Sequence, residues 1–391
     1  MQKYVQYIAV LFIAASIAAC GSSGTTTTAV PIYDSPAALA PPNTQMGGAV
    51  QKTPLDLNNT VSTLAGSPEI SILTDGSGTA ARFNHPTDIT TDGTNFYVAD
   101  YANYAIRKIT KLGEVTTLQC TDADTGISTG FNLPFSLTVK ADGAQLYVVD
   151  AGSNTIRIID IDTVNNTNKV TTIGSTEGLS GSVDSAVKTD VRFNRPTGIT
   201  TDGDNLYVTD SGNDTIRRID LKNNYTVSTL AGTAGIIGST DGGPKVALFN
   251  LPQRITTDRI SLYVTDFNNR TIRKVDILTG EVSTIAGKSG PLEAATDGIG
   301  SEARFYQPNG ITTDGTYLYV TDSYLNTVRR IDKISPYNVT TISIPDDSLH
   351  TPLGITTDGF SLFIADTYTV TRDPKTMIDT YTYSNSIIKI D

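Results

Sequence analysis

The chain has 391 residues, a formal net charge of −11 at pH 7 and no tryptophan. Nucleic-acid binding needs a basic surface, so this acidic chain is not expected to bind RNA or DNA. Length alone would suggest two or three domains, but an internal repeat predicts one large domain that follows a leader and a linker.

The first residues have the features of an export signal. Lys3 provides a positive start, an apolar run over 5–15 follows, and small residues precede Cys20. The run is too short to span a membrane as a stable helix. Residues 17–20 resemble a bacterial lipobox, which implies removal of signal peptide 1–19 and lipidation of Cys20. An ordinary cleaved signal that happens to hold a cysteine is the alternative.

Residues 20–57 form the predicted linker, which is rich in Thr, Ala, Pro and Gly. Such a composition is typical of a disordered tether. Lipidation of the lipobox type adds more than one acyl chain (palmitate among them), and two such signals suffice for stable membrane anchoring. We therefore expect a lipoprotein of the cell envelope, and Gly21 after the cysteine favours the outer membrane. The sequence does not predict whether the domain faces the periplasm or the surface.

One unit repeats through the rest of the chain and is clearest at 193–232, FNRPTGITTDGDNLYVTDSGNDTIRRIDLKNNYTVSTLAG. It contains four short apolar segments separated by turn residues such as Asp202-Gly203. Segments of this length, rich in β-branched residues and Tyr, predict strands and not helices. Because the connections are short, neighbouring strands should be antiparallel, and one unit is a four-stranded meander.

Further copies of the unit predict the architecture; they begin at Phe83, Phe131, Phe249 and Phe305 and, in weaker form, at Leu349. Six units at intervals of roughly fifty residues indicate an all-β fold, a six-bladed β-propeller. The last unit lacks its fourth segment, whereas residues 60–66 (TVSTLAG) are identical to 226–232. We predict that residues 60–65 form the outermost strand of the last blade and close the ring, in a domain that spans 58–391.

The patterns F-N-x-P-x-G-I, LYV-x-D-x-x-N-x-x-I-R and V-x-TLAG resemble the NHL repeat over about residues 58–391. The resemblance implies a six-bladed propeller. It says little about function, because NHL propellers serve as protein-binding, RNA-binding, sensor and, in divergent relatives, enzyme domains. The absence of tryptophan excludes a WD40 propeller at its signature residue.

Several polar residues recur in every blade or nearly so. An aspartate ends the second strand at Asp100, Asp150, Asp210, Asp266, Asp322 and Asp366. We interpret these as residues that accept backbone N–H bonds in their own turns, although a ring of Asp and neighbouring Asn that binds cations or sugar hydroxyls is the alternative. An arginine follows the apolar residue of strand three at Arg107, Arg157, Arg217, Arg273 and Arg329. We interpret these as exposed charges that pair between neighbouring strands or blades.

Loops that enter the blades begin with Asp75, Asp241 and Asp297, each followed by glycine. They loosely resemble calcium loops but lack the alternating oxygen ligands and the bidentate Glu. We therefore interpret them as turns supported by glycine.

The two faces of the propeller can be distinguished from strand direction. The loops before strand one and between strands two and three lie on one face, called here the first face, and the other turns lie on the second face. Asp-Gly turns dominate the second face, and the long, variable loops lie on the first. Because variable loops on a rigid scaffold carry function, we expect the partner on the first face.

Two residues break the repeat where the innermost strand begins. At this position the other blades have Gly or Ser, whereas blades one and four have Asp88 and Arg254. Blades one and four oppose each other in a ring of six. A carboxylate and a guanidinium that face one channel could bind a polar ligand, form a plain ion pair, or point into water.

The last blade has an insertion over 367–384 that we predict to be an extended hairpin turning at 372–375. Tyr368, Tyr381 and Tyr383 lie on its arms, and Tyr is favoured at interfaces. A partner contact and a self-packed hairpin that shields an edge are both compatible with the sequence.

We find no catalytic constellation in the sequence. The only histidines, His85 and His350, stand at different offsets from their prolines, and no nucleophile is paired with a base at a readable position. Cys120 reads as a small apolar residue near the end of the first blade's outer strand. We expect no metal, no cofactor and no enzyme activity, but a binding or scaffold module for an envelope protein or glycan. The alternative is a metal-dependent hydrolase or lyase at the channel mouth.

Overall fold

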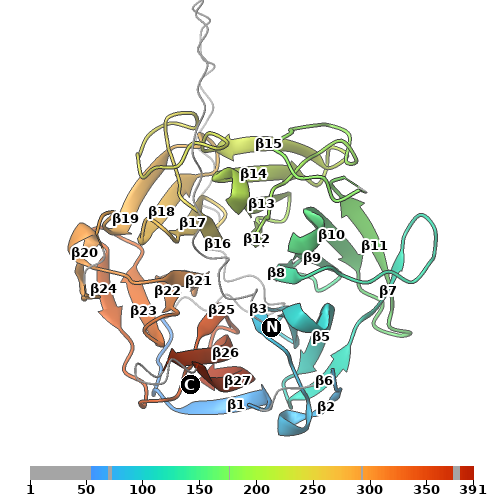
Figure 1. The fold of residues 1–391 in the computed structure, drawn as a ribbon, viewed down its shortest axis with the longest axis horizontal. Helices are drawn as coiled ribbons and strands as arrows, with labels where there is room; N and C mark the ends of the chain where they lie inside the picture. The colour runs from blue at the N-terminus through green and yellow to red at the C-terminus, as the bar shows by residue number, and fades with distance from the viewer. Residues whose placement is uncertain (1–53, 69–72, 176, 292–293, 373–378) are drawn as a thin grey trace, which may run out of the picture. The chain divides into compact units, whose positions relative to one another are not determined.

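The computed structural model describes residues 54–68, 73–175, 177–291, 294–372 and 379–391, and within the last hairpin it describes no side chains over 368–383. The predicted signal peptide, Cys20 and the tether up to residue 53 lie outside the described residues. From residue 54 onward the described chain forms six β-sheets arranged as the blades of a ring (Figure 1). The predicted all-β, six-bladed propeller is confirmed.

The first three blades are built from strands that run outward from the axis in chain order. Blade one contains β3 (Pro86–Thr91), β4 (Asn95–Asp100), β5 (Ala105–Thr110) and β6 (Glu114–Thr117). Blade two contains β8 (Pro134–Val139), β9 (Gln145–Asp150), β10 (Thr155–Asp160) and β11 (Thr167–Ile173). Blade three contains β12 (Gly198–Thr201), β13 (Asn205–Asp210), β14 (Thr215–Asp220) and β15 (Thr226–Ala231).

The last three blades repeat this order, except that the final strand of blade six comes from the other end of the chain. Blade four contains β16 (Pro252–Thr257), β17 (Ser261–Asp266), β18 (Thr271–Asp276) and β19 (Val282–Gly287). Blade five contains β21 (Pro308–Thr313), β22 (Tyr317–Asp322), β23 (Thr327–Asp332) and β24 (Asn338–Thr341). Blade six contains β25 (Pro352–Thr357), β26 (Leu362–Arg372), β27 (Asp379–Ile390) and β1 (Val61–Gly66).

Three blades carry a fifth strand that the repeat did not predict. The short strands β2 (Gly76–Ser77) and β20 (Gly298–Ile299) pair with β6 and β24. In blade two, β7 (Gln119–Asp122) pairs in parallel with β11. Cys120 is buried in β7, so it lies at the outer edge of blade two and not, as expected from the repeat, at the end of the first blade's outer strand.

Helical structure in the described residues is limited to five single turns of 3-10 helix. These are η1 (Gly78–Ala80), η2 (Tyr101–Asn103), η3 (Ala151–Ser153), η4 (Ser211–Asn213) and η5 (Gly300–Glu302). Three of them, η2, η3 and η4, connect strands two and three on the first face.

The recurring Asp and Tyr explain why the second face turns tightly. In blade three, Asp202 accepts backbone N–H bonds from Asp204 and Asn205, and Gly203 takes the positive φ of +99° that this turn requires. The hydroxyl of Tyr207, a fully buried residue of β13, donates to Asp202 at 2.7 Å. The same Tyr–Asp bond recurs in blades one, four and five.

The hydrophobic core lies between the blades. Each of six buried clusters combines residues of two adjacent blades, as Val149 and Ile156 of blade two pack with Leu206 and Val208 of blade three. The innermost strands contact one another around the axis. A blade therefore depends on both of its neighbours to bury its two faces.

The ring closes through β1, as predicted from the matching ends of the chain. Val61 pairs with Ile390 and Gly66 with Ser386 in an antiparallel register with one bulge. Ala65 is fully buried between blades six and one, and the rings of Phe96 and Phe363 meet there at 4.2 Å. The chain before β1 also contributes, because the buried Leu55 donates its N–H to the Asp314 turn on the second face.

Removal of β1 should therefore unfold the propeller. A chain that starts at residue 67 loses the strand pairing, and its hydrogen bonds at about 1 kcal/mol each are comparable to a total stability of roughly 5–15 kcal/mol. We expect no cooperative melting transition for this chain by circular dichroism. A chain that starts at residue 54 retains β1 and Leu55 and is expected to melt like the full-length protein; equal melting of both would contradict the closure.

Candidate functional site

Each of five blades contains an arginine buried against its own second-strand aspartate. In blade three, Nη1 of Arg217 lies 2.7 Å from Asp210, and neither side chain is exposed. Nη2 of Arg217 lies 2.6 Å from Asp184 in the entry loop, and the guanidinium lies over the ring of Phe193 at 5.1 Å. The interpretation of these arginines as exposed charges is wrong. It failed because each guanidinium lies against the second-strand carboxylate and an aromatic ring of its own blade, and four of the five also donate to backbone carbonyls.

The entry-loop aspartates complete these networks. Asp75, Asp241 and Asp297 each accept a bond from the buried arginine of their blade at 2.8–2.9 Å. Their carboxylates also accept bonds from the backbone and hydroxyl of one threonine on the outer strand, which is Thr117, Thr284 or Thr341. The aspartate of each loop thus links the buried arginine to the outer strand by hydrogen bonds. The sequences that resembled calcium loops therefore have a structural role.

The second-strand aspartates also hold the first face together. Their carboxylates accept N–H bonds from the loop that precedes strand one, as Asp210 does from Asn194 at 2.7 Å, and not mainly from their own turns as predicted. Asn213 donates to the same carboxylate at 2.8 Å. Burial raises the pKa of Asp210, whereas Arg217 and these donors act in the opposite direction.

Blade six lacks the buried arginine, and the residues that surround this arginine in the other blades are replaced as well. Ile388 stands in the arginine's place and Leu349 in that of the stacked Phe, and both are buried in the cluster between blades five and six. The fully buried Asp366 instead accepts bonds from the backbone of His350 and Thr351, and the His350 ring lies 3.3 Å away. The bond to Asp366 raises the pKa of His350.

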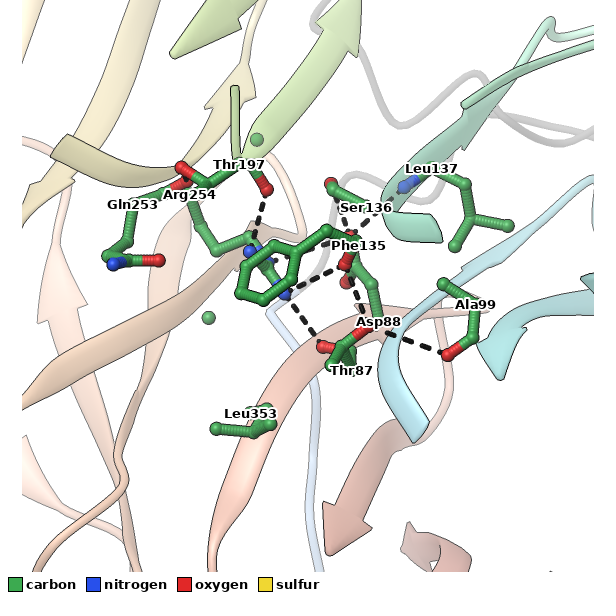
Figure 2. A network of polar contacts seen from close by, with 12 residues as sticks. Thr87, Asp88, Ala99, Phe135, Ser136, Leu137, Thr197, Gln253, Arg254 and Leu353 are labelled. Carbon is green, nitrogen blue, oxygen red and sulfur yellow. Dashed lines mark hydrogen bonds and ion pairs between the residues drawn. The ribbon is translucent and has the colours of Figure 1, made fainter. Parts of the chain in front are cut away.

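Asp88 and Arg254 meet in the centre of the ring. Nε of Arg254 lies 3.6 Å from the Asp88 carboxylate, and the two residues are 3% and 7% exposed. Figure 2 shows the guanidinium reaching across the channel, where it donates to the carbonyls of Thr87, Phe135 and Thr197 from blades one to three. Of the alternatives that the sequence left open, the structure shows the ion pair.

The ion pair closes the channel because three blades have glycine at the same level. A Cβ on Gly354 would lie 2.2 Å from the Asp88 carboxylate, and one on Gly198 would lie 2.9 Å from Cα of Arg254. Asp88 also accepts bonds from the Ser136 hydroxyl at 2.5 Å and from the N–H groups of Ile89 and Leu137. Arg254, which stacks on Phe135 at 4.4 Å, thus fixes the relative positions of four blades.

A cavity of about 100 Å³ lies between this ion pair and the second face. Its lining begins at Asp88 and Arg254 and ends at the turn residues Asp202, Gly203 and Arg259. We call it the axial well. This well was not predicted from the sequence. Most of its wall is formed by the Ile-Thr-Thr of the innermost strands, which recurs in five repeats.

The first face carries two features of blades five and six. The hairpin of β26 and β27 continues beyond the blade, from the pair Tyr368–Tyr383 to the pair Arg372–Asp379. The predicted extended hairpin is present, and its turn over 373–378 lies outside the described residues. In blade five the rings of Tyr306 and Tyr324 stack at 4.0 Å, with Tyr324 60% exposed. The sequence analysis did not identify this pair.

The remaining candidate groups, Cys120, His85 and the side chains that could bind a metal, form no site in the described part of the chain. Burial raises the pKa of the Cys120 thiol to about 11 and lowers the pKa of His85 to about 4. Among the described residues, no three His, Cys, Asp or Glu side chains gather as a metal site. No described helix has the length and apolar character needed to cross a membrane.

Sequence comparison agrees with the repeat and the six blades. In an alignment 293 positions long that covers 66% of this chain, it is 27% identical to NHL repeat-containing protein 2 of Homo sapiens. The chain therefore resembles NHL-repeat proteins in sequence, and its structure is a six-bladed β-propeller. It spans only 40% of that human relative's length, and no protein-family model matches it.

Solved structures share the fold of this propeller. A structural-genomics protein of unknown function from Bacteroides thetaiotaomicron superposes with a TM-score of 0.60 at 21% identity, covering 84% of this chain and 75% of that one. An auxiliary nutrient binding protein from the same organism superposes with a TM-score of 0.59 at 13% identity, covering 85% and 76%. At such identities the likeness establishes the fold alone.

Adjacent arginines in this propeller allow a matched test of the buried networks. Arg217→Ala leaves the buried Asp210 without its cation and should lower the free energy of unfolding by about 3–5 kcal/mol. The neighbouring Arg218 is exposed, so Arg218→Ala should change stability by less than about 0.5 kcal/mol. Chemical denaturation of the two variants measures both values. Equal losses of unfolding free energy would show that a buried Arg–Asp pair contributes no more to stability than an exposed arginine.

His350 predicts a pH dependence specific to blade six. A raised His pKa contributes stability that is complete below the unfolded value of about 6.5 and is lost as pH rises through the folded value. Asp366 and Asp347 are the charged groups that raise it. We expect Tm of the wild type, relative to His350→Asn, to fall between mildly acidic and mildly alkaline pH. Parallel Tm profiles of the two proteins would contradict this.

Proposed function

We propose that the propeller is a non-catalytic binding or scaffold module of a bacterial cell envelope, whose partner is an envelope protein or glycan bound on the first face. The hairpin of β26 and β27 is the observation that carries the proposal. Blades one to three connect the same two strands through one 3-10 turn each, whereas the blade-six arms continue for five more residue pairs. At about 3.3 Å per residue, this makes an arm of roughly 15 Å.

The positions of the hairpin tyrosines support an aromatic contact surface. Tyr368 pairs with Tyr383, and Tyr381 pairs with Val370. Because alternate residues of a strand share one face, these four positions fall on the same face of the hairpin, and threonines occupy the other. The stacked Tyr306 and Tyr324 of the adjacent blade belong to the same face of the propeller.

We propose that the anchor is attached on the face opposite this surface. The chain meets the propeller on the second face, where Leu55 binds the Asp314 turn. A tether that runs from a lipidated Cys20 to this point reaches the face opposite the hairpin. Palmitate labelling of cells that express the wild type and Cys20→Ser tests the anchor: we expect label and membrane retention only in the wild type. Labelling of both proteins would exclude Cys20 as the site.

Affinity capture from envelope extract tests the partner surface. In one variant the insertion 367–384 is replaced by the turn Ser211–Asp214 of blade three, and a second carries Tyr368→Ser, Tyr381→Ser and Tyr383→Ser. Leu278→Ser, in an exposed turn of the second face, is the control. We expect both hairpin variants to lose a protein or glycan that the wild type and the control retain. Unchanged capture by the hairpin variants would overturn the face assignment.

A further inference from the structure

The wall of the axial well contains one ring of hydroxyls. Each innermost strand contributes the first threonine of its Ile-Thr-Thr or equivalent sequence, which are Thr90, Thr138, Thr200, Thr256, Thr312 and Thr356. The preceding Ile or Leu of each strand also lines the well. The innermost strands are sheet edges, so alternate backbone N–H and C=O groups face the axis as well.

These hydroxyls differ from those of the next residue along each strand. Thr91, Thr201, Thr257, Thr313 and Thr357 donate to carbonyls of their own turns at 2.7–3.0 Å. By contrast, within the described residues, no hydrogen-bond partner exists for the side chains of Thr90, Thr200, Thr256, Thr312 and Thr356. Thr90, Thr200 and Thr356 are nevertheless only 4–7% exposed. Their hydroxyl oxygens are not among the fully buried unpaired atoms of the described residues, so they face the free space of the well and can hydrogen-bond to a molecule there.

The floor of the well favours a neutral occupant. Asp88 and Arg254 neutralise each other, and their remaining bonds go to Ser136 and to backbone groups of the surrounding blades. Near this floor, away from Asp202 and Arg259 at the mouth of the well, an ionic ligand would bring a charge without a counter-ion into a buried site, which is strongly unfavourable. Hydroxyl groups both donate and accept, so they match a ring of threonines and exposed backbone edges.

We propose that the axial well binds a small, uncharged, hydroxyl-rich molecule of the size of a polyol or monosaccharide, which enters from the second face. The free space of about 100 Å³ compares with roughly 10–15 Å³ for one water, so several hydroxyl-bearing carbons fit. The aliphatic Ile and Leu side chains would contact the carbon skeleton. The site lies on the opposite side of the ion pair from the hairpin surface and is independent of the partner proposed there.

Isothermal titration calorimetry of the full chain with glycerol, myo-inositol, xylose and glucose tests the site. We expect at least one of these probes to bind with a stoichiometry of one. Thr200→Val with Thr312→Val removes two hydroxyls at nearly constant shape and should weaken that binding by at least about tenfold. Thr200→Ser with Thr312→Ser keeps the hydroxyls and should retain affinity within about threefold. Thr116→Val, on the exposed side of β6, is the control for the fold.

Three results would overturn the proposal: no binding of any of the four probes, binding that the valine pair leaves unchanged, or binding of Na⁺ or K⁺ alone. Circular dichroism of the valine and serine pairs separates loss of the site from loss of the fold. Because capture of an envelope partner is measured with the hairpin variants, its failure does not alter the outcome of this titration.

Discussion

Every blade of this propeller has two apolar faces, and only a closed ring covers both. The six hydrophobic clusters all lie between neighbouring blades, so a missing blade or an open seam would expose two of these faces at once. The seam between blades six and one is held by β1, by Ala65 and by the contact of Phe96 with Phe363. The geometry of the channel, and hence of any site in it, exists only because this seam is closed.

Buried charged residues connect the parts of each blade and also connect four blades at the centre of the ring. The five buried arginines each join a strand end, an entry loop and an aromatic ring within one blade, whereas Arg254 joins four different blades. A buried pair is costly unless every donor has an acceptor. Backbone carbonyls are acceptors for four of the five arginines within blades and for Arg254. Each of these buried charges is therefore stable only in one conformation of the main chain.

The repeat was sufficient to predict the strands, the number of blades and the closing strand, because each is encoded by local turn chemistry and by matching ends. The burial of Arg217 was not predicted, since the strand carries two consecutive arginines and both of its faces are covered. Recurrence was the sequence signal for this burial. The position equivalent to 217 is arginine in five blades, whereas the next position varies and is Lys108, Ile158, Arg218, Lys274 or Arg330. The meeting of Asp88 and Arg254 was foreseen as a possibility from the ring. The axial well was not predicted, because a cavity depends on how side chains from six different strands pack around the axis, which the repeat of one blade does not specify.

The register of β1 has a consequence for how the chain is made. Residues 61–66 pair with residues near the C-terminus, and the backbone N–H of His85 donates to the side-chain oxygen of Asn385, 300 positions away. During synthesis, the first strand therefore waits until the last hairpin has emerged, and up to that moment it carries an open edge that could pair with another chain. Contacts at such sequence separation also slow folding. If this protein is exported as we propose, late closure of the ring would keep the chain unfolded until it has passed a translocation pore.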